Sequence, residues 1–365
     1  QDSVVHFRLG LIYESKGLLR EAADAFTEAA ARRDDYSPWD YYHLGRVLIT
    51  LGEYREACMA LSEIREVKRP FALPVTTDKY DIKQIYAEHL ATLDVRPDVV
   101  LYESFHGASI SCNPYALFRY LLAQQEHAQR LHVWVVKSPE SIPQRYCAMR
   151  NVIFVRHGSS LYLRYLATAG YLINNNSFFP YFLRRPEQKY LNTWHGTPLK
   201  TLGVDVPSAP FEHKNVVRNI LQCTHLIYPN RHTRDTFLRA YQADDLYNGK
   251  LANTGYPRID LMLNADARRR QQLRAELAID NERPVALYAP TWRGSATPEM
   301  DIEHLMADLE QLSGYPINLV VSAHHLLYDV LKQSTLPVIL LRSGIDTTEF
   351  LSVVDVLITD YSSVM

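Results

Sequence analysis

The spacing of apolar residues changes near residue 97. Before that point, apolar and small residues recur at helical spacing, and after it short β-rich runs alternate with helical stretches. Helical spacing predicts an α-helical module over 1–96. The alternation predicts parallel βα units from 97 onward, with functional side chains at the carboxyl ends of the strands.

The predicted helical module contains an internal repeat. LGLIYESKGLLREAADAF (9–26) matches LGRVLITLGEYREACMAL (44–61) at an offset of 35, so that Gly10 and Gly17 recur as Gly45 and Gly52. Small residues recur where two antiparallel helices touch. The pattern resembles the tetratricopeptide repeat (TPR). Since about three repeats are needed for a stable stack, we expect 78–93 or a preceding helix to complete it. A partner-binding groove and a packing spacer are equally consistent with the repeat.

The first βα series has its strands in DVVLYES (98–104), LHVWVVK (131–137), NVIFVRHG (151–158), YLINN, KYLNTWHG and THLIYPN (224–230). A second series has strands in PVALYAP (284–290), INLVVSA (317–323), PVILL (337–341) and VLITD (356–360). The two series predict a GT-B arrangement of two Rossmann-like domains, 97–264 and 265–365, with the active site between them. The sequence stops at Met365, just after the fourth strand, so we expect the second domain to be incomplete.

Composition narrows the functional classes. Hydrophobic residues make up 47% and charged residues 22% of the chain, the balance of a globular protein, and the net charge of -2 argues against a nucleic-acid partner. No apolar run is long enough for a transmembrane helix, and the first residues do not form a signal peptide.

The four cysteines are far apart in the sequence, which predicts free, buried thiols in a reducing cytoplasm. Neither GxGxxG nor GxxxxGK[ST] follows a strand, which disfavours dinucleotide and P-loop chemistry.

The block NTWHGTPLKTLG (192–203) carries the strongest chemical signal. It puts His195 directly after an apolar strand, where an imidazole can reach a cleft and take a proton near neutral pH. A structural histidine is the alternative. The neighbouring residues predicted to lie on the acceptor side are Trp194, Gly196, Thr197 and Lys200.

Three further clusters follow strands of the second series. YAPTWRG (288–294) offers Thr291 and Arg293 for a phosphate, and SAHHLL (322–327) again ends an apolar strand in histidine. TDYSSV (359–364) offers Asp360 and a serine pair that could open a helix, where backbone amides and hydroxyls bind anions. An exposed loop arginine and an ordinary serine N-cap are the alternatives.

Together these clusters resemble the CDP-glycerol:poly(glycerophosphate) glycerophosphotransferase family, the teichoic-acid and capsule polymerases of bacteria. WHGTPLK, YAPTWR and TDYSS resemble its signature blocks and occur in the family's order. ESFHGASISCNPYALFRYL (103–121) and GYPRIDLM (255–262) resemble further blocks. The resemblance covers roughly 98–365 and leaves the repeat outside.

The resemblance implies a role for individual residues. His195 would be the base that activates the acceptor hydroxyl. A second histidine would contact the donor diphosphate, normally in an HP-type motif; this chain has His324-His325 without the proline, and the distance from the strand favours His324. Ser362 and Ser363 would bind donor phosphate.

The implied reaction transfers glycerol phosphate, or ribitol phosphate, from a CDP-alditol to a lipid-linked or polymeric acceptor and releases CMP. The sequence shows no acidic cluster with metal-ligand spacing, so we expect no tightly bound metal, although magnesium could bind loosely to the donor diphosphate. The competing readings are a TPR scaffold with a degenerate transferase domain and a GT-B nucleotide-sugar glycosyltransferase. The repeats could bind a protein partner.

The segment SFFPYFLRRPEQKY (177–190) predicts contact with a membrane. It places Phe178 and Phe179 beside Arg184 and Arg185, and aromatic rings next to cations can anchor a protein to an anionic lipid surface. This predicts a peripheral position on the inner face of the plasma membrane, weakened by salt. Aromatics in the core with a solvated cationic rim are an equally weighted alternative.

Overall fold

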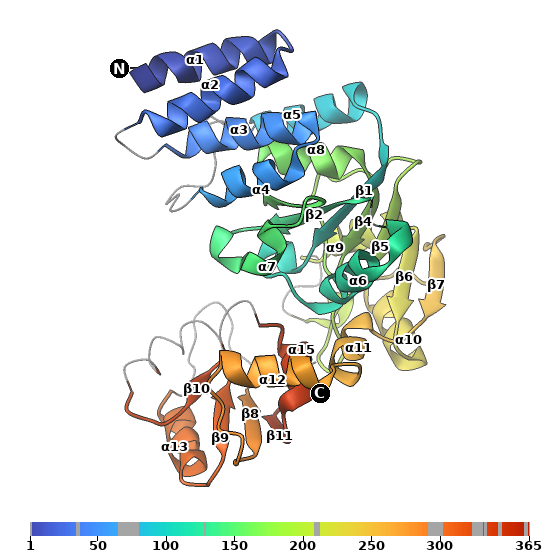
Figure 1. The fold of residues 1–365 in the computed structure, drawn as a ribbon. Helices are drawn as coiled ribbons and strands as arrows, with labels where there is room; N and C mark the ends of the chain where they lie inside the picture. The colour runs from blue at the N-terminus through green and yellow to red at the C-terminus, as the bar shows by residue number, and fades with distance from the viewer. Residues whose placement is uncertain are drawn as a thin grey trace.

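The structure, a computed structural model, describes residues 2–33, 37–64, 80–127, 129–207, 212–290, 302–322, 331, 334–341, 345–360 and 364. Figure 1 shows N-terminal helices, a larger parallel sheet in the middle and a smaller parallel sheet toward the C-terminal end. Several predicted donor-site residues lie outside the described residues: Thr291, Arg293, His324, His325, Ser362 and Ser363.

The N-terminal part is helical, as the apolar spacing predicts. Its helices are α1 (Asp2–Ser15), α2 (Leu19–Ala31), α3 (Pro38–Leu51), α4 (Tyr54–Ser62) and α5 (Tyr80–Thr92). Consecutive helices from α1 to α4 pack against one another. Within this series, α3 begins with a proline at its first position and ends at Gly52, whose φ of 79° is the left-handed conformation that glycine adopts without strain.

The sequence repeat is also a repeat in packing. Gly10 lies against the ring of Phe26, and Gly45 lies against the side chain of Leu61, at the same offset along the chain. A Cβ atom at either glycine would lie 2.6 Å from its neighbour's side chain. The small residue is therefore what lets each helix approach the next.

The helical part shares its core with the larger sheet. One apolar cluster contains Phe26 and Val47 together with strand residues such as Val133. Helix α5 packs against α8 (Ser160–Thr168), and its Tyr86 hydroxyl donates a hydrogen bond to the Leu183 carbonyl oxygen at 3.1 Å. Helix α5 thus packs on the α/β part.

The larger sheet is parallel throughout, with order β3-β2-β1-β4-β5-β6-β7 in the described part of the chain. Its strands are β1 (Arg96–Glu103), β2 (Leu131–Val136), β3 (Val152–Arg156), β4 (Ala169–Asn174), β5 (Lys189–Asn192), β6 (His225–Tyr228) and β7 (Lys250–Asn253). The sequence pattern predicts the first six and misses β7, whose residues are half-buried or exposed and form no apolar run.

Helices cover both faces of this sheet. One face packs against α8 and the N-terminal helices, and the other packs against α6 (Cys112–Ala123) and α7 (Gln144–Cys147). Alternate residues of β1 supply the two faces: Val99 and Leu101 to one, Val100 and Tyr102 to the other. The remaining helices of this part are α9 (Lys214–Gln222) and α10 (Arg231–Ala240).

The smaller sheet is also parallel, with order β10-β9-β8-β11. Its strands are β8 (Val285–Ala289), β9 (Asn318–Val321), β10 (Ile339–Leu340) and β11 (Val356–Thr359), all within segments that the sequence predicts as strands. The helices around it are α12 (Ala267–Glu276), α13 (Ile302–Ser313) and α15 (Thr347–Phe350).

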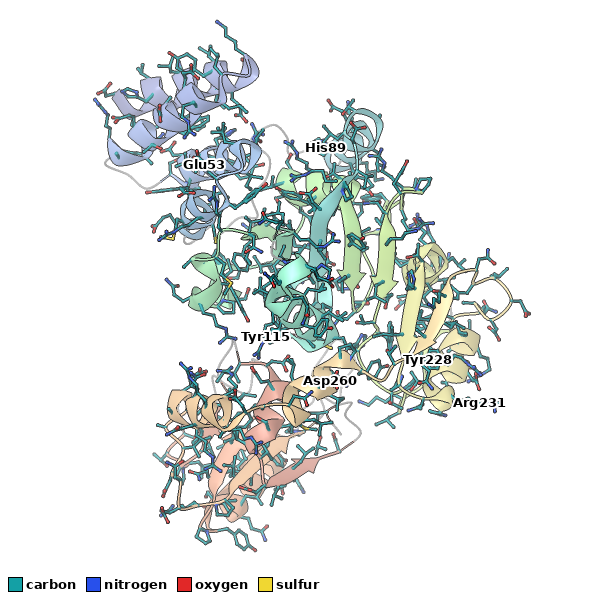
Figure 2. The ribbon with its side chains drawn as sticks, turned by 45° about the vertical axis from the view of Figure 1, so that its right-hand side comes forward. Glu53, His89, Tyr115, Tyr228, Arg231 and Asp260 are labelled. Carbon is teal, nitrogen blue, oxygen red and sulfur yellow. The ribbon has the colours of Figure 1, made fainter. Side chains whose placement is uncertain are left out.

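Helix α11 (Pro257–Leu263) lies where the two halves meet and packs against both α6 and α15. Figure 2 places Tyr115 of α6 and Asp260 of α11 at this junction. The backbone amide of Cys112 donates a 2.7 Å hydrogen bond to the Asp346 carboxylate, which also caps α15. Within the described ranges, no helix has both the length and the apolarity to cross a bilayer.

Candidate active site

The strand order of the larger sheet reverses at one position, next to β1. From β1 the chain proceeds outward through β2 and β3, then returns to β4 on the other side of β1. In open parallel sheets, ligands bind at the carboxyl ends of the strands where the order reverses in this way. We therefore expect the catalytic side chains among the residues that follow β1, β4 and β5.

His195 lies three residues after β5 and reaches the end of β4. Its Nδ1 lies 2.7 Å from the backbone oxygen of Asn175. A carbonyl oxygen only accepts, so Nδ1 carries the proton and the lone pair of the neutral imidazole is on Nε2. Since Nε2 makes no hydrogen bond to any described residue, this is the arrangement of a general base.

The chain turns sharply just before His195. Trp194 has a φ of 50°, a left-handed conformation that is strained for a bulky side chain. Its amide donates to the side-chain oxygen of Asn192 at 2.9 Å, and its carbonyl accepts from the side chain of Asn113 at 3.1 Å. The Trp194 ring packs on Phe237 and stacks on the His195 imidazole at 4.3 Å between centroids. The hydrogen bonds from the buried side chains of Asn192 and Asn113 stabilise this strained backbone. Stacking on the indole ring orients the imidazole.

Two residues of the GYPRIDLM block hold the backbone on the other side of His195. Arg258 donates to the His195 carbonyl oxygen at 2.9 Å, and the Tyr256 hydroxyl donates to the Gly196 carbonyl oxygen at 3.0 Å. The sequence pattern of this block indicates no role for either residue. Through these two hydrogen bonds, Tyr256 and Arg258 fix the backbone of the WHG turn.

Burial lowers the pKa of His195, and the positive charge of Arg258 adds to this effect, while the hydrogen bond to the Asn175 carbonyl opposes it. The imidazole therefore stays neutral further into the acid range than an ordinary histidine. A base must be neutral to accept a proton, so this shift keeps His195 in its working form at neutral pH.

Backbone strain gathers around this histidine. Among the described non-glycine residues, positive φ occurs at Phe105, His106, Cys112 and Trp194, which lie in the block 103–121 and in WHG, as well as at two positions elsewhere. The Phe105 amide bonds the side chain of Asn175 at 2.9 Å, and its ring packs against His195. Such strain persists where the surroundings enforce it, and it clusters at functional sites.

A second group of titratable side chains lies at the same sheet edge. Burial raises the pKa of Glu103 to about 8 and lowers the pKa of His157 to about 4. Burial also lowers the pKa of His106, and the Lys137 ammonium adds to this shift. No sequence spacing brings Glu103 and His157 together, because Glu103 ends β1 and His157 follows β3, on either side of β2.

The other acceptor-side residues have unequal exposure. Gly196 is buried, Thr197 is half-buried, and Lys200 is exposed. In the smaller sheet, β8 has β9 and β11 as its neighbours. Asp360, which is half-buried, follows β11, so three of the predicted clusters begin at adjacent strand ends.

The predicted membrane contact at Phe178 is wrong. Phe178 is 0% exposed and packs on Tyr190 in the core, and Phe179 is half-buried against the same cluster. Arg184 and Arg185 are half-buried and donate to backbone carbonyls, including those of Gln222 and Leu93. The aromatic rings complete the core, and the cations tie this segment to its neighbours.

The four cysteines are all buried and free, as the sequence predicts.

Comparison with known proteins gives a consistent family. Residues 85–365 match the model described as CDP-Glycerol:Poly(glycerophosphate) glycerophosphotransferase. The chain is 28% identical over 293 residues to a teichoic acid poly(glycerol phosphate) polymerase of Staphylococcus epidermidis, covering 74% of this chain and 39% of that protein. The polymerase of the same description from Bacillus subtilis is 29% identical, covering 74% and 37%. The chain thus spans less than two-fifths of the length of these relatives.

Solved structures agree on the fold. The wall teichoic acid polymerase TagF aligns with 91% of this chain and 76% of its own, with a TM-score of 0.61 and 24% identity. A TagF variant soaked with CDPG aligns over 90% and 74%, also with a TM-score of 0.61.

Proposed function

Because the chain belongs to the CDP-glycerol:poly(glycerophosphate) glycerophosphotransferase family, we propose that it transfers glycerol phosphate from CDP-glycerol to a teichoic acid polymer. The relatives are described as teichoic acid poly(glycerol phosphate) polymerases, and a structural neighbour was soaked with CDPG. The observation that carries the proposal is the His195 imidazole, whose Nδ1 is bonded to a carbonyl so that Nε2 is left to accept a proton.

In the proposed reaction, Nε2 of His195 takes the proton of the acceptor hydroxyl. The hydroxyl oxygen then attacks the donor phosphorus that bears glycerol. A new P–O bond forms as the bond from that phosphorus to the CMP oxygen breaks, and the bond electrons leave on CMP. Positioning and charge stabilisation supply most of the catalysis in such phosphoryl transfers.

The donor would bind to the smaller-sheet half. Thr291, Arg293 and His324 are proposed to meet the diphosphate, with Asp360, Ser362 and Ser363 beside them. The support is the order of the strands, since β8, β9 and β11 are neighbours and the clusters follow their carboxyl ends. CDP-ribitol is the alternative donor, a capsule polymer is an alternative acceptor, and magnesium bound loosely on the diphosphate is compatible with this arrangement.

A donor panel tests the proposal. CDP-glycerol, CDP-ribitol and a UDP-sugar are each incubated with acceptor, and CMP or UDP release is measured. We expect CMP release from CDP-glycerol, reduced about 10²–10⁴-fold in His195→Ala. His225→Ala is the matched control, because that histidine is also shifted to lower pKa but begins β6 at the opposite sheet edge. Release from the UDP-sugar alone, or equal rates in His195→Ala and wild type, would contradict the proposal.

The helical hairpins are proposed to be TPR-like. The support is the repeated contact of a helix glycine with a bulky side chain one helix later, at Gly10 and Gly45. Helix α1 leaves Val5 and Ile12 exposed, at 61% and 49%, where a further repeat or a protein partner could pack.

A peripheral position on the cytoplasmic face of an anionic membrane also stays a proposal. With Phe178 in the core, the exposed apolar side chains of this segment are Tyr181 and Leu183, at 42% and 57%. Co-sedimentation with anionic vesicles should therefore be tested with Tyr181→Ser/Leu183→Ser, which leaves the core intact.

A further inference from the structure

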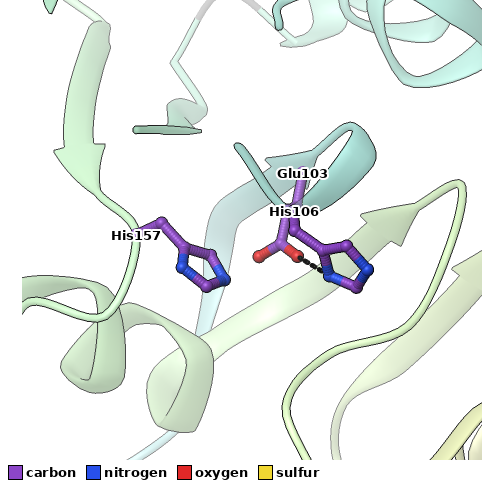
Figure 3. A group of neighbouring side chains, drawn as sticks. All are labelled: Glu103, His106 and His157. Carbon is purple, nitrogen blue, oxygen red and sulfur yellow. Dashed lines mark ion pairs between the residues drawn. The ribbon is translucent and has the colours of Figure 1, made fainter. Parts of the chain in front are cut away.

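We propose that Glu103, His106 and His157 form a binding site for one divalent transition metal ion of the zinc class. One ligand atom from each residue can be chosen so that all three lie within 4.8 Å of one another. Figure 3 shows the carboxylate between the two imidazoles. Glu103 ends β1, His106 lies in the turn after it, and His157 follows β3.

The buried Glu103 carboxylate is the feature of this group that favours a bound cation. Its side chain is 0% exposed. Oε1 lies 3.5 Å from the Asn174 side-chain nitrogen and 3.9 Å from Nδ1 of His106. Oε2 makes no hydrogen bond of normal geometry to a described residue, and the polar group that interacts with the carboxylate on this side is the buried Tyr162 hydroxyl. A buried carboxylate oxygen without a hydrogen bond of normal geometry is costly, and a coordinated cation is one way in which proteins satisfy it.

The donor set selects the kind of metal. Two imidazole nitrogens and one carboxylate oxygen suit zinc and related transition metals, whereas magnesium and calcium prefer ligand sets made of oxygen alone. Three protein ligands leave the fourth tetrahedral position to water, as in open zinc sites. The loosely bound magnesium expected on a donor diphosphate is therefore a different ion at a different place.

The geometry requires a small adjustment. Metal–ligand bonds of about 2.0–2.2 Å put tetrahedral ligand atoms about 3.3–3.6 Å apart, so the group must contract by about 1 Å. The His106 side chain is 42% exposed, so it has room for this movement, which would give up its hydrogen bond with the Ser177 backbone. His157 is held by its ring contact with Tyr162, at 5.1 Å between centroids, and supplies a fixed wall.

The Lys137 ammonium is a positive charge that opposes a cation here, because it acts on all three ligands. Lys137 is exposed, and its backbone rather than its ammonium is fixed, through a 2.7 Å hydrogen bond to the Gly107 carbonyl. A lysine on a flexible stem can turn its charge into water, so it does not block the site.

The metal itself is the probe. Metal-stripped protein is titrated with Zn²⁺ by calorimetry and with Co²⁺ while its visible ligand-field absorption is recorded. We expect one ion per chain and a Co²⁺ spectrum of low coordination number. Glu103→Gln, His106→Ala and His157→Ala should each weaken binding by more than the 10–100-fold, roughly, that loss of an outer-shell partner costs.

His127→Ala is the matched control, since that histidine lies 3.3 Å from a surface carboxylate, Glu126, without a third ligand. It should bind as wild type does. Far-ultraviolet circular dichroism of each metal-free variant checks the fold, and Glu103→Gln keeps the side-chain shape. Absence of binding in wild type overturns the proposal, as does equal binding in wild type and His157→Ala, which would place the ion on other histidines or cysteines.

Discussion

At His195, one hydrogen bond decides which nitrogen can act. The Asn175 carbonyl accepts from Nδ1 at 2.7 Å, so Nε2 is the basic atom. The partner is a neutral backbone carbonyl rather than a carboxylate, so this hydrogen bond brings no full negative charge to stabilise the imidazolium. Burial and the charge of Arg258 both lower the pKa of this histidine.

The proposed reaction should therefore lose rate only at low pH. Because the pKa of His195 is lowered, its neutral form is retained below the ordinary histidine value of about 6.5. We expect kcat/KM to be level near pH 7 and to fall as pH drops through the lowered pKa. A pH profile of CMP release checks this. An acid limb centred above the ordinary histidine value would contradict it.

His132 makes the fold sensitive to acid in a separate way. It is 0% exposed, and burial lowers its pKa to about 4. The unfolded chain takes up this proton below about pH 6.5 and the folded chain only near the lowered pKa, so stability is lost as pH falls between those values. From pH 7 to pH 5 the loss from this residue should be about 2 kcal/mol.

His132→Phe tests the assignment, because a phenyl ring can keep the ring contacts with Tyr102 and Phe118 but cannot titrate. The variant also loses the 2.9 Å hydrogen bond between the Tyr102 hydroxyl and Nδ1, so the change in stability between the two pH values is compared rather than the stability itself. Urea unfolding at pH 7 and pH 5 should show a smaller acid loss in this variant than in wild type. Equal losses in both proteins would place the acid sensitivity elsewhere.

At the scale of elements, the helical hairpins depend on the absence of a side chain. A Cβ at Gly10 would lie 2.6 Å from the Phe26 ring, which is fully buried and packed on Phe7 and His43. In an open helix position, replacement of glycine by alanine gains about 1 kcal/mol. Here the rigid ring leaves no room for the methyl group.

Gly10→Ala should therefore destabilise the protein, by up to about 2 kcal/mol, because an overpacking cost of about 1–3 kcal/mol is set against a gain in helix propensity of about 1 kcal/mol. Chemical unfolding of Gly10→Ala, Phe26→Leu and the double variant measures this. The two changes should be less than additive, since the leucine makes room for the methyl group. Stabilisation by Gly10→Ala alone would show that the contact is loose.

At the scale of the whole molecule, a small polar network joins the two halves. Glu349 of α15 pairs with Arg119 of α6, and it pairs with Arg269 of α12 at 2.8 Å. The Glu349 side chain is only 2% exposed. Asp346, in the same turn, accepts from the Cys112 amide. The network thus connects the block that carries the strained turns to the second sheet.

Glu349→Gln should loosen this junction by about 2–3 kcal/mol, because it leaves two arginines without their carboxylate. Thermal unfolding and limited proteolysis of the chain between the halves would report it. Glu276→Gln is the control: Glu276 pairs with the same Arg269 at 3.2 Å but is 44% exposed, so less than about 1 kcal/mol should be lost. Equal effects of the two variants would mean that the junction does not depend on Glu349.

Local sequence determined the elements and the most specific chemistry of this protein. Short β-rich runs and helical spacing are set by which side chains must be buried, so they predict most strands and the repeated hairpins. The WHGTPLK block predicts a functional role for His195, because a histidine directly after an apolar strand lies at the edge of the sheet. The pattern misses β7 because half-exposed residues leave no apolar run.

Tertiary structure decided what surrounds that histidine. The WHG turn is held by hydrogen bonds to three separate segments, through Asn175, Asn113 and Arg258. The side chain of Glu103 lies near that of His157 only because β3, β2 and β1 are neighbours in the sheet. It also decided between the two readings of Phe178, since a sequence rich in aromatics and cations fits either a lipid surface or a core. Hydrogen bonds between residues far apart in the chain, and the burial of their side chains, depend on the order of the strands in the sheet. A local sequence pattern does not specify that order.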